Sequence, residues 1–197
     1  MFGGPGRDTI LGGEGNNLIY GEAGNDVVTA RSGDDTLYGG SGNDRIQGGA
    51  GSDALFGDEG NDQLSAGGGS DLLHGGLGND ILNGGSGDDV LFGGAGNDRL
   101  SGDAGMDLLI GGTGFDAVRG GADNDILSGG NASNEDDQIA LLQLLSDWSS
   151  NLTSPTLGTL TDDATPDGLR GDSGVDVIYV GIDDSLATQA NDSLISL

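Results

Sequence analysis

The sequence predicts an all-β fold, a flattened parallel β-helix (β-solenoid) of about seven two-strand coils, with a C-terminal amphipathic helix and a resumed final coil as cap. Three observations carry this prediction. A nine-residue phrase begins at Gly3 and repeats fourteen times without insertion or deletion to Ser128. The eighth place of the phrase is always aliphatic. The sixth place is aspartate in every unit except the one that holds Asn17.

Each nine-residue unit divides into a turn and a short strand. Places one to six are rich in glycine, which tolerates the positive φ of tight turns, and place four is glycine in all units except the last, which has Asp123. Places seven to nine form the strand, and the eighth points into the core. The eighth-place residues are Ile10, Ile19, Val28, Leu37, Ile46, Leu55, Leu64, Leu73, Leu82, Leu91, Leu100, Leu109, Val118 and Leu127. Two units make one coil, so residues eighteen apart stack at about 4.8 Å.

The sixth-place carboxylates would lie in rows about 5 Å apart, where unneutralised charges repel one another strongly. A cation is therefore expected between them. Ca²⁺ suits the site best because it accepts six to eight oxygens in flexible geometry, whereas Mg²⁺ requires stricter geometry and Zn²⁺ prefers nitrogen or sulfur ligands. The chain has one histidine and no cysteine. The candidate ligands in the repeats are Asp8, Asp26, Asp35, Asp44, Asp53, Asp62, Asp71, Asp80, Asp89, Asp98, Asp107, Asp116 and Asp125.

The phrase Gly-Gly-x-Gly-x-Asp-x-aliphatic-x, as in residues 75–83, resembles the hemolysin-type (RTX) calcium-binding repeat of bacterial secreted proteins. The likeness covers residues 3–128 and returns at 171–179, where Asp176 adds a candidate ligand. The resemblance implies a parallel β-roll in which each calcium lies between two loops one coil apart. It also implies export through a type I pathway with a C-terminal signal.

The arrangement that the resemblance implies has loops along two edges of the roll. Loops starting at 3, 21, 39, 57, 75, 93 and 111 would line the first edge, and loops starting at 12, 30, 48, 66, 84, 102 and 120 the second. Each edge offers six gaps between successive loops, so the roll would hold up to about twelve calcium ions. Asn17 and Asp123 lie in the outermost loops of the second edge, which weakens the prediction for those terminal sites.

Composition limits the classes of partner and the source of stability. A net charge of -27, from 33 acidic and 6 basic residues, argues against nucleic acid and anionic membranes as partners. No apolar run is long enough to span a membrane. One aliphatic side chain for every nine residues is a thin core, and no disulfide can supplement it. We therefore expect the chain to fold when calcium binds.

The sequence predicts three segments: the repeat roll at 1–130, a helix-bearing insert or cap at 131–164, and a resumed final repeat with a C-terminal tail at 165–197. The helix is expected over residues 133–148, with three acidic residues near its start. Its apolar residues Ile139, Leu142, Leu145 and Trp148 would cover the end of the roll, or alternatively dock a partner or membrane. The last seven residues read as an export signal or as an ordinary exposed terminus.

Together with the resemblance to RTX proteins, these features predict a secreted, calcium-loaded roll that acts as a structural or adhesive module outside a bacterial cell. The alternative is a non-catalytic calcium-binding module of a secreted hydrolase, protease or polysaccharide-modifying enzyme. No catalytic role is expected, because His74 is the only histidine and acidic pairs such as Asp34 and Asp35 are explained by metal binding. Candidate partners besides calcium are a cell-surface or polysaccharide ligand, and a second copy joined end to end through the first coil.

Overall fold

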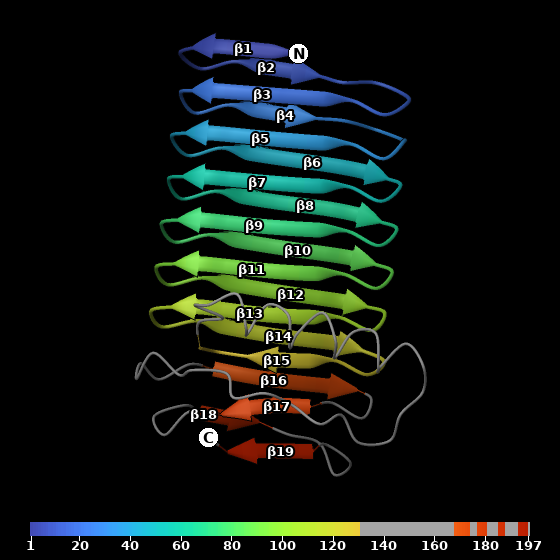
Figure 1. Ribbon diagram of the computed structural model, residues 1–197, viewed down its shortest axis with the longest axis vertical. Coiled ribbons are helices and arrows are strands. Elements are labelled where there is room, and N and C mark those ends of the chain that lie inside the picture. Colours follow the sequence, from blue (N-terminus) through green and yellow to red (C-terminus); the bar gives the residue numbers. More distant parts are fainter. Residues whose placement is uncertain (131–167, 174–176, 181–184, 188–192, 197) are drawn as a thin grey trace, which may run out of the picture.

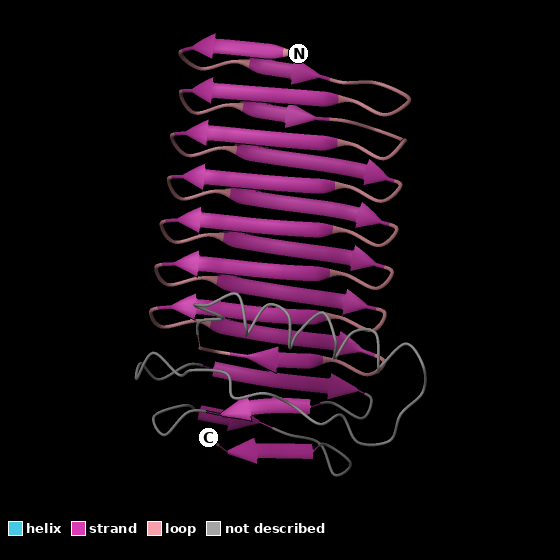
Figure 2. Ribbon diagram, in the orientation of Figure 1, coloured by secondary structure: helices cyan, strands magenta, loops and turns pink. Residues whose placement is uncertain are grey.

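The computed structural model describes residues 1–130, 168–173, 177–180, 185–187 and 193–196 (Figure 1). Every regular element in these residues is a β-strand (Figure 2), which confirms the predicted all-β parallel solenoid. The helix expected over 133–148 and the candidate ligand Asp176 lie outside the described residues. No helix that could span a membrane is present in the part of the chain that the structure describes.

The strands form two sheets that face each other across the core, and the chain alternates between them at every strand (Figure 1). The odd sheet contains, in spatial order, β1 (Phe2–Pro5), β3 (Leu18–Ala23), β5 (Thr36–Ser41), β7 (Ala54–Glu59), β9 (Leu72–Leu77), β11 (Val90–Ala95), β13 (Leu108–Thr113), β15 (Ile126–Ser128), β17 (Val177–Val180) and β19 (Ser193–Ser196). The even sheet contains β2 (Thr9–Leu11), β4 (Val27–Thr29), β6 (Arg45–Ala50), β8 (Gln63–Gly68), β10 (Ile81–Ser86), β12 (Arg99–Ala104), β14 (Ala117–Ala122), β16 (Gly168–Ser173) and β18 (Ser185–Ala187).

All neighbouring strands are parallel, and up to Ser128 each residue pairs with the residue eighteen positions later. The repeat length sets this register, because two nine-residue units complete one coil. After the insert, β16 pairs with β14 and places Leu169 opposite Val118. Leu169 lies two residues before Gly171, where the phrase at 171–179 begins, so it has the eighth place of the preceding unit, as Val118 has in its own. Asp172 of β16 forms ion pairs with Arg119 of β14 and with Arg170.

The core is a single column of eighth-place side chains between the two sheets. From Ile19 to Leu127 these side chains are buried, and Ile10 packs against the first of them. Ala30 and Ala66, which replace glycine at place one, are the other buried apolar residues of this column. The column is only one side chain wide, because places seven and nine point away from it; Leu108, Ile110 and Ile126, at these places in β13 and β15, are buried but do not belong to the core cluster. The sequence prediction of a thin core is therefore confirmed.

Place four shows why the turns need glycine. Its φ is positive in every unit, from Gly6 to Gly114, and Asp123 adopts a φ of 73° in the last one. Successive turns also stack very closely. A Cβ built on Gly60 would overlap the carbonyl oxygen of Gly42, one coil earlier. Two requirements, backbone conformation and lack of space, thus fall on the same residue.

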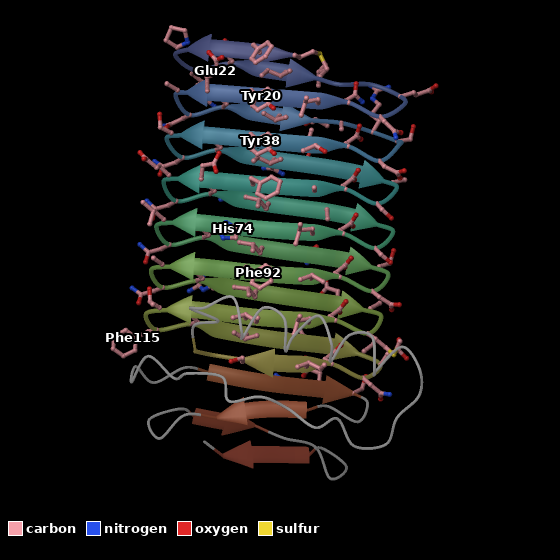
Figure 3. All side chains as sticks on the ribbon, in the orientation of Figure 1. Tyr20, Glu22, Tyr38, His74, Phe92 and Phe115 are labelled. Atoms are coloured by element: carbon pink, nitrogen blue, oxygen red, sulfur yellow. The ribbon has the colours of Figure 1, made fainter. Side chains whose placement is uncertain are left out.

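The two outer faces of the roll differ at place nine. On the odd sheet, aromatic side chains form a column along the rod, visible through the labelled Tyr20, Tyr38, His74 and Phe92 in Figure 3. The rings of Phe2, Tyr20, Tyr38 and Phe56 stack with centroids 5.1, 4.9 and 4.8 Å apart. On the even sheet the same place holds Leu11 in β2 and then polar residues, namely Thr29, Gln47, Ser65, Asn83, Ser101 and Arg119. The roll therefore has one aromatic and one polar face.

Candidate metal centre

The sixth-place aspartates end each turn and directly precede each strand, so the alternation of strands places them in two rows. Loops starting at 3 and every eighteen residues later connect an odd strand to the next even one and form the first edge. The loops between them form the second edge. The aspartates at 26, 35, 44, 53, 62, 71, 80, 89, 98, 107, 116 and 125 are at most 3% exposed. Asp8 is half-buried, in the first coil.

One oxygen of each carboxylate links two coils. The backbone N–H of Asp62 donates to Oδ1 of Asp80 at 2.7 Å, and the N–H of Asp44 donates likewise to Oδ1 of Asp62 at 2.7 Å. The second edge repeats the pattern, as where the N–H of Asp53 donates to Asp71 at 2.7 Å. The backbone N–H of each aspartate therefore orients the carboxylate of the aspartate one coil later. This hydrogen-bond ladder fixes the direction in which the other oxygen points.

The second carboxylate oxygen, Oδ2, is buried and accepts no hydrogen bond from the described residues. This holds for Asp8, Asp26, Asp35, Asp44, Asp53, Asp62, Asp71, Asp80, Asp89, Asp98 and Asp107. A buried, unpartnered carboxylate oxygen is costly, and native structures seldom leave one without a partner or an ion. These two rows of unpartnered oxygens are therefore the candidate positions for bound cations.

A carbonyl oxygen of the next coil approaches the same point as Oδ2 at the place-one glycines Gly3, Gly21, Gly39, Gly48, Gly57, Gly75, Gly93 and Gly102. A Cβ on Gly57 would lie 2.5 Å from Oδ2 of Asp62 and 2.5 Å from the carbonyl oxygen of Gly75, one coil later. We call this space, bounded by a place-one Cα, its own sixth-place Oδ2 and the next coil's carbonyl, a cradle. A carboxylate and a carbonyl are ligands that Ca²⁺ prefers.

The cradle depends on backbone oxygens as well as side chains. Within the described residues, no three acidic or imidazole side chains gather at one point. Stacked loops bring carboxylates together only as neighbours in a row, so a hard cation bound here must complete its shell with carbonyl oxygens or water. The donor set fits calcium and does not fit zinc, which prefers nitrogen and sulfur.

Burial raises the pKa of several of these carboxyl groups. The pKa of Asp62 rises to about 7, mainly through loss of hydration, partly offset by the donated N–H of Asp44 and increased by the charges of Asp80 and Asp44. The pKa of Asp89 also rises to about 7, and that of Asp53 to about 6, with burial again the main cause. Without metal, Asp62 and Asp89 therefore hold protons near neutral pH that exposed aspartates would release.

A raised pKa sets the sign of the pH dependence. An aspartate with an ordinary pKa of 3.8 that titrates near 7 when folded binds a proton on folding, so metal-free stability is greatest below pH 3.8 and falls as the pH rises toward 7. Calcium competes with those protons. We expect the calcium concentration that half-saturates folding to decrease about tenfold or more between pH 5.5 and pH 7.5. Calcium titrations followed by far-ultraviolet circular dichroism at the two pH values would measure this, and equal midpoints would contradict it.

Asn17 changes one cradle. Its amide Nδ2 donates to Oδ1 of Asp35 at 2.9 Å and to the carbonyl oxygen of Gly15 at 2.5 Å. The amide is uncharged and links two acceptors directly, so the loops at 12 and 30 are held together by hydrogen bonds. The sequence analysis made a weaker prediction of calcium binding between the loops at 12 and 30, and these hydrogen bonds give a structural reason for it.

Sequence reasoning missed a ladder at place five. Oδ1 of Asn43 accepts from the N–H of Asn61 at 2.7 Å, and Oδ1 of Asn61 accepts from that of Asn79 at 2.7 Å. The direction is opposite to that of the aspartate ladder, so each turn is tied to both of its neighbours. The available signal was the recurrence of asparagine every eighteen residues on the first edge.

Comparison with protein-family models finds the RTX calcium-binding nonapeptide repeat over residues 2–37, 29–64, 38–73, 65–100 and 101–135. These ranges together cover more than half of the chain. A search of curated proteins finds no match.

Proposed function

The chain belongs to the RTX calcium-binding nonapeptide repeat family, and from this premise we propose that it is a secreted rod whose folding depends on calcium and which acts as a structural or adhesive module outside a bacterial cell. Its β-roll binds calcium. The proposal adds the location of the ions, the dependence of folding on them, and the role of the folded rod.

The observation that supports the proposal is the pair of buried Oδ2 rows, with a carbonyl oxygen of the next coil close to the same place-one Cα in eight of the loops. Burial of so many carboxylates is unfavourable without counter-ions, and the core is only one side chain wide. Ions that bind the folded coil alone would stabilise it by mass action. A chain of this kind would stay unfolded at low calcium and fold at the higher calcium concentration outside a cell.

The proposed role is structural rather than catalytic. The only histidine, His74, belongs to the aromatic column on the outer face, between Phe56 and Phe92. Burial lowers its pKa, with the charge of Asp58 acting in the opposite direction. The acidic residues at sixth places are accounted for by the cradles. A regular rod with an aromatic and a polar face supplies a surface for adhesion or a spacer between other parts.

Two measurements test the proposal. Antibody detection in fractions of the source bacterium should find the chain in the medium or at the cell surface, and its confinement to the cytoplasm would contradict a secreted role. Sedimentation velocity with and without calcium should show the loaded chain as an elongated, ordered particle. If the molar mass rises to twice that of one chain at high protein concentration, and the particle also becomes more elongated, two copies associate end to end.

The alternative is that this rod is the calcium-binding module of a secreted hydrolase, protease or polysaccharide-modifying enzyme. The chemistry of the roll is the same in both cases, so only the neighbouring coding sequence discriminates them. A catalytic domain encoded in the same reading frame would favour the enzyme-associated role. A continuing array of repeats would favour the structural one.

A further inference from the structure

The two loop edges of the roll are not equivalent. Every loop of the first edge has glycine at place one and aspartate at place six. Three loops of the second edge depart from this pattern, through Asn17 in the loop at 12, Ala30 in the loop at 30 and Ala66 in the loop at 66. All three departures fall on the residues that build a cradle.

The alanines place a methyl group where the oxygens converge. In the glycine loops of the same edge, a Cβ on Gly48 would contact Oδ2 of Asp53, and one on Gly84 would contact Oδ2 of Asp89. Ala30 and Ala66 are 2% and 1% exposed, so their methyl groups lie in the interior. A methyl group offers no ligand and takes the space beside the carboxylate. The cradles of the loops at 30 and 66 are therefore narrowed.

The loop at 30 also has a different backbone. Arg31, at place two of this loop, does not have a positive φ. In all the remaining units between residues 3 and 128, place two has a positive φ, even where it is Glu22, Asp58 or Asp103. The strand that leads into this loop, β4, has three residues, as does its neighbour β2, whereas β6 has six. Across the loop at 30 only isolated bridges form, from Ser32 to Glu14 and to Ala50.

The loop at 66 keeps the common backbone. Gly67 has a φ of 122°, and β8 extends over six residues. The added methyl group is thus its only departure. The loop at 12 differs in another way, since the amide of Asn17 joins Asp35 and Gly15 directly.

We infer that the roll binds calcium unevenly: the six gaps of the first edge and the second-edge gaps 48/66, 84/102 and 102/120 take calcium tightly, whereas the gaps 12/30, 30/48 and 66/84 bind it weakly or not at all. This inference rests on the proposed position of the ions in the cradles. It separates two classes of site on one rod, and it assigns the difference to three residues. Within residues 3–128 the tight class has nine members and the weak class three.

The cleanest test is Ala66→Gly. The backbone already matches its neighbours, so removing the methyl group should convert the gap 66/84 to a tight site. Equilibrium dialysis and native mass spectrometry at limiting free calcium should then detect one more ion per chain than in the wild type. The reverse change, Gly75→Ala on the first edge, should remove one ion. Circular dichroism in saturating calcium would verify that each variant folds.

Ala50→Gly is the matched control, because Ala50 occupies an exposed place three and lies outside any cradle. It should leave the number of tightly bound ions unchanged. If the wild type binds calcium but Ala66→Gly gains no ion, the inference of unequal edges is wrong while the proposed function stands. If the wild type binds no calcium tightly, the position of the ions in the cradles fails, and the inference fails with it.

Discussion

Removal of calcium from the loaded chain is expected to abolish most of its β-sheet signal. The roll buries two rows of carboxylates against a core one side chain wide. Without ions, each buried Oδ2 loses its counter-charge, and neighbouring carboxylates repel along the row. We expect the ellipticity near 218 nm to fall by about half or more in excess chelator and to return when calcium is restored. Far-ultraviolet circular dichroism during the titration measures both changes.

Magnesium is the control for this experiment. It prefers strict octahedral geometry and keeps its waters, so at equal concentration it should restore much less sheet than calcium does. Equal recovery with the two ions would show that charge screening alone drives folding. Sheet content that persists unchanged in chelator would show that the core suffices by itself, and would contradict calcium-dependent folding.

Replacement of Asp80 by alanine is expected to be the most damaging single change to the metal centre. Asp80 lies mid-array, and its Oδ1 accepts the N–H of Asp62 while its Oδ2 faces the cradle of Gly75. The alanine variant loses the ion's ligand and leaves a buried N–H without its acceptor. We expect unfolding in saturating calcium to become easier by about 2 kcal/mol or more. Urea denaturation at fixed calcium measures this loss.

Two matched variants separate the causes. Asp80→Asn keeps an acceptor for the N–H of Asp62 but removes the charge, so it isolates the contribution of the ion. Asp8→Ala should cost much less, because Asp8 is half-buried, whereas Asp80 is buried. Equal losses at Asp8 and Asp80 would contradict the stacked-loop arrangement.

The sequence was sufficient for the arrangement of the coils because one period carries both local and long-range information. It was wrong about strand length, because strands such as β6 and β8 also include places one to three, which were expected to be part of the turn. The aliphatic eighth place predicted the core column, and the pairing of two units predicted the eighteen-residue register seen between Val90 and Leu108. Even Leu169, beyond the insert, has the register that counting predicts. The repeat period thus predicted which distant residues pair, which a single sequence normally does not reveal.

The finer features of the site could not be read from the repeat. The spacing placed Asp62 and Asp80 in one row, but did not tell which oxygen bonds to the backbone and which faces the cradle. That division follows from the orientation of an N–H one coil away.

The constant pairing distance also makes the length of this rod adjustable. Up to Ser128, strand pairs join residues eighteen apart, so loss or duplication of one eighteen-residue coil would leave every other coil with equivalent neighbours. Loss of nine residues would not be so harmless. Each later loop would move to the opposite edge, and the aromatic column would be divided between the two faces. Recombination within such a gene can therefore change the reach of the rod in whole coils without redesign of any contact.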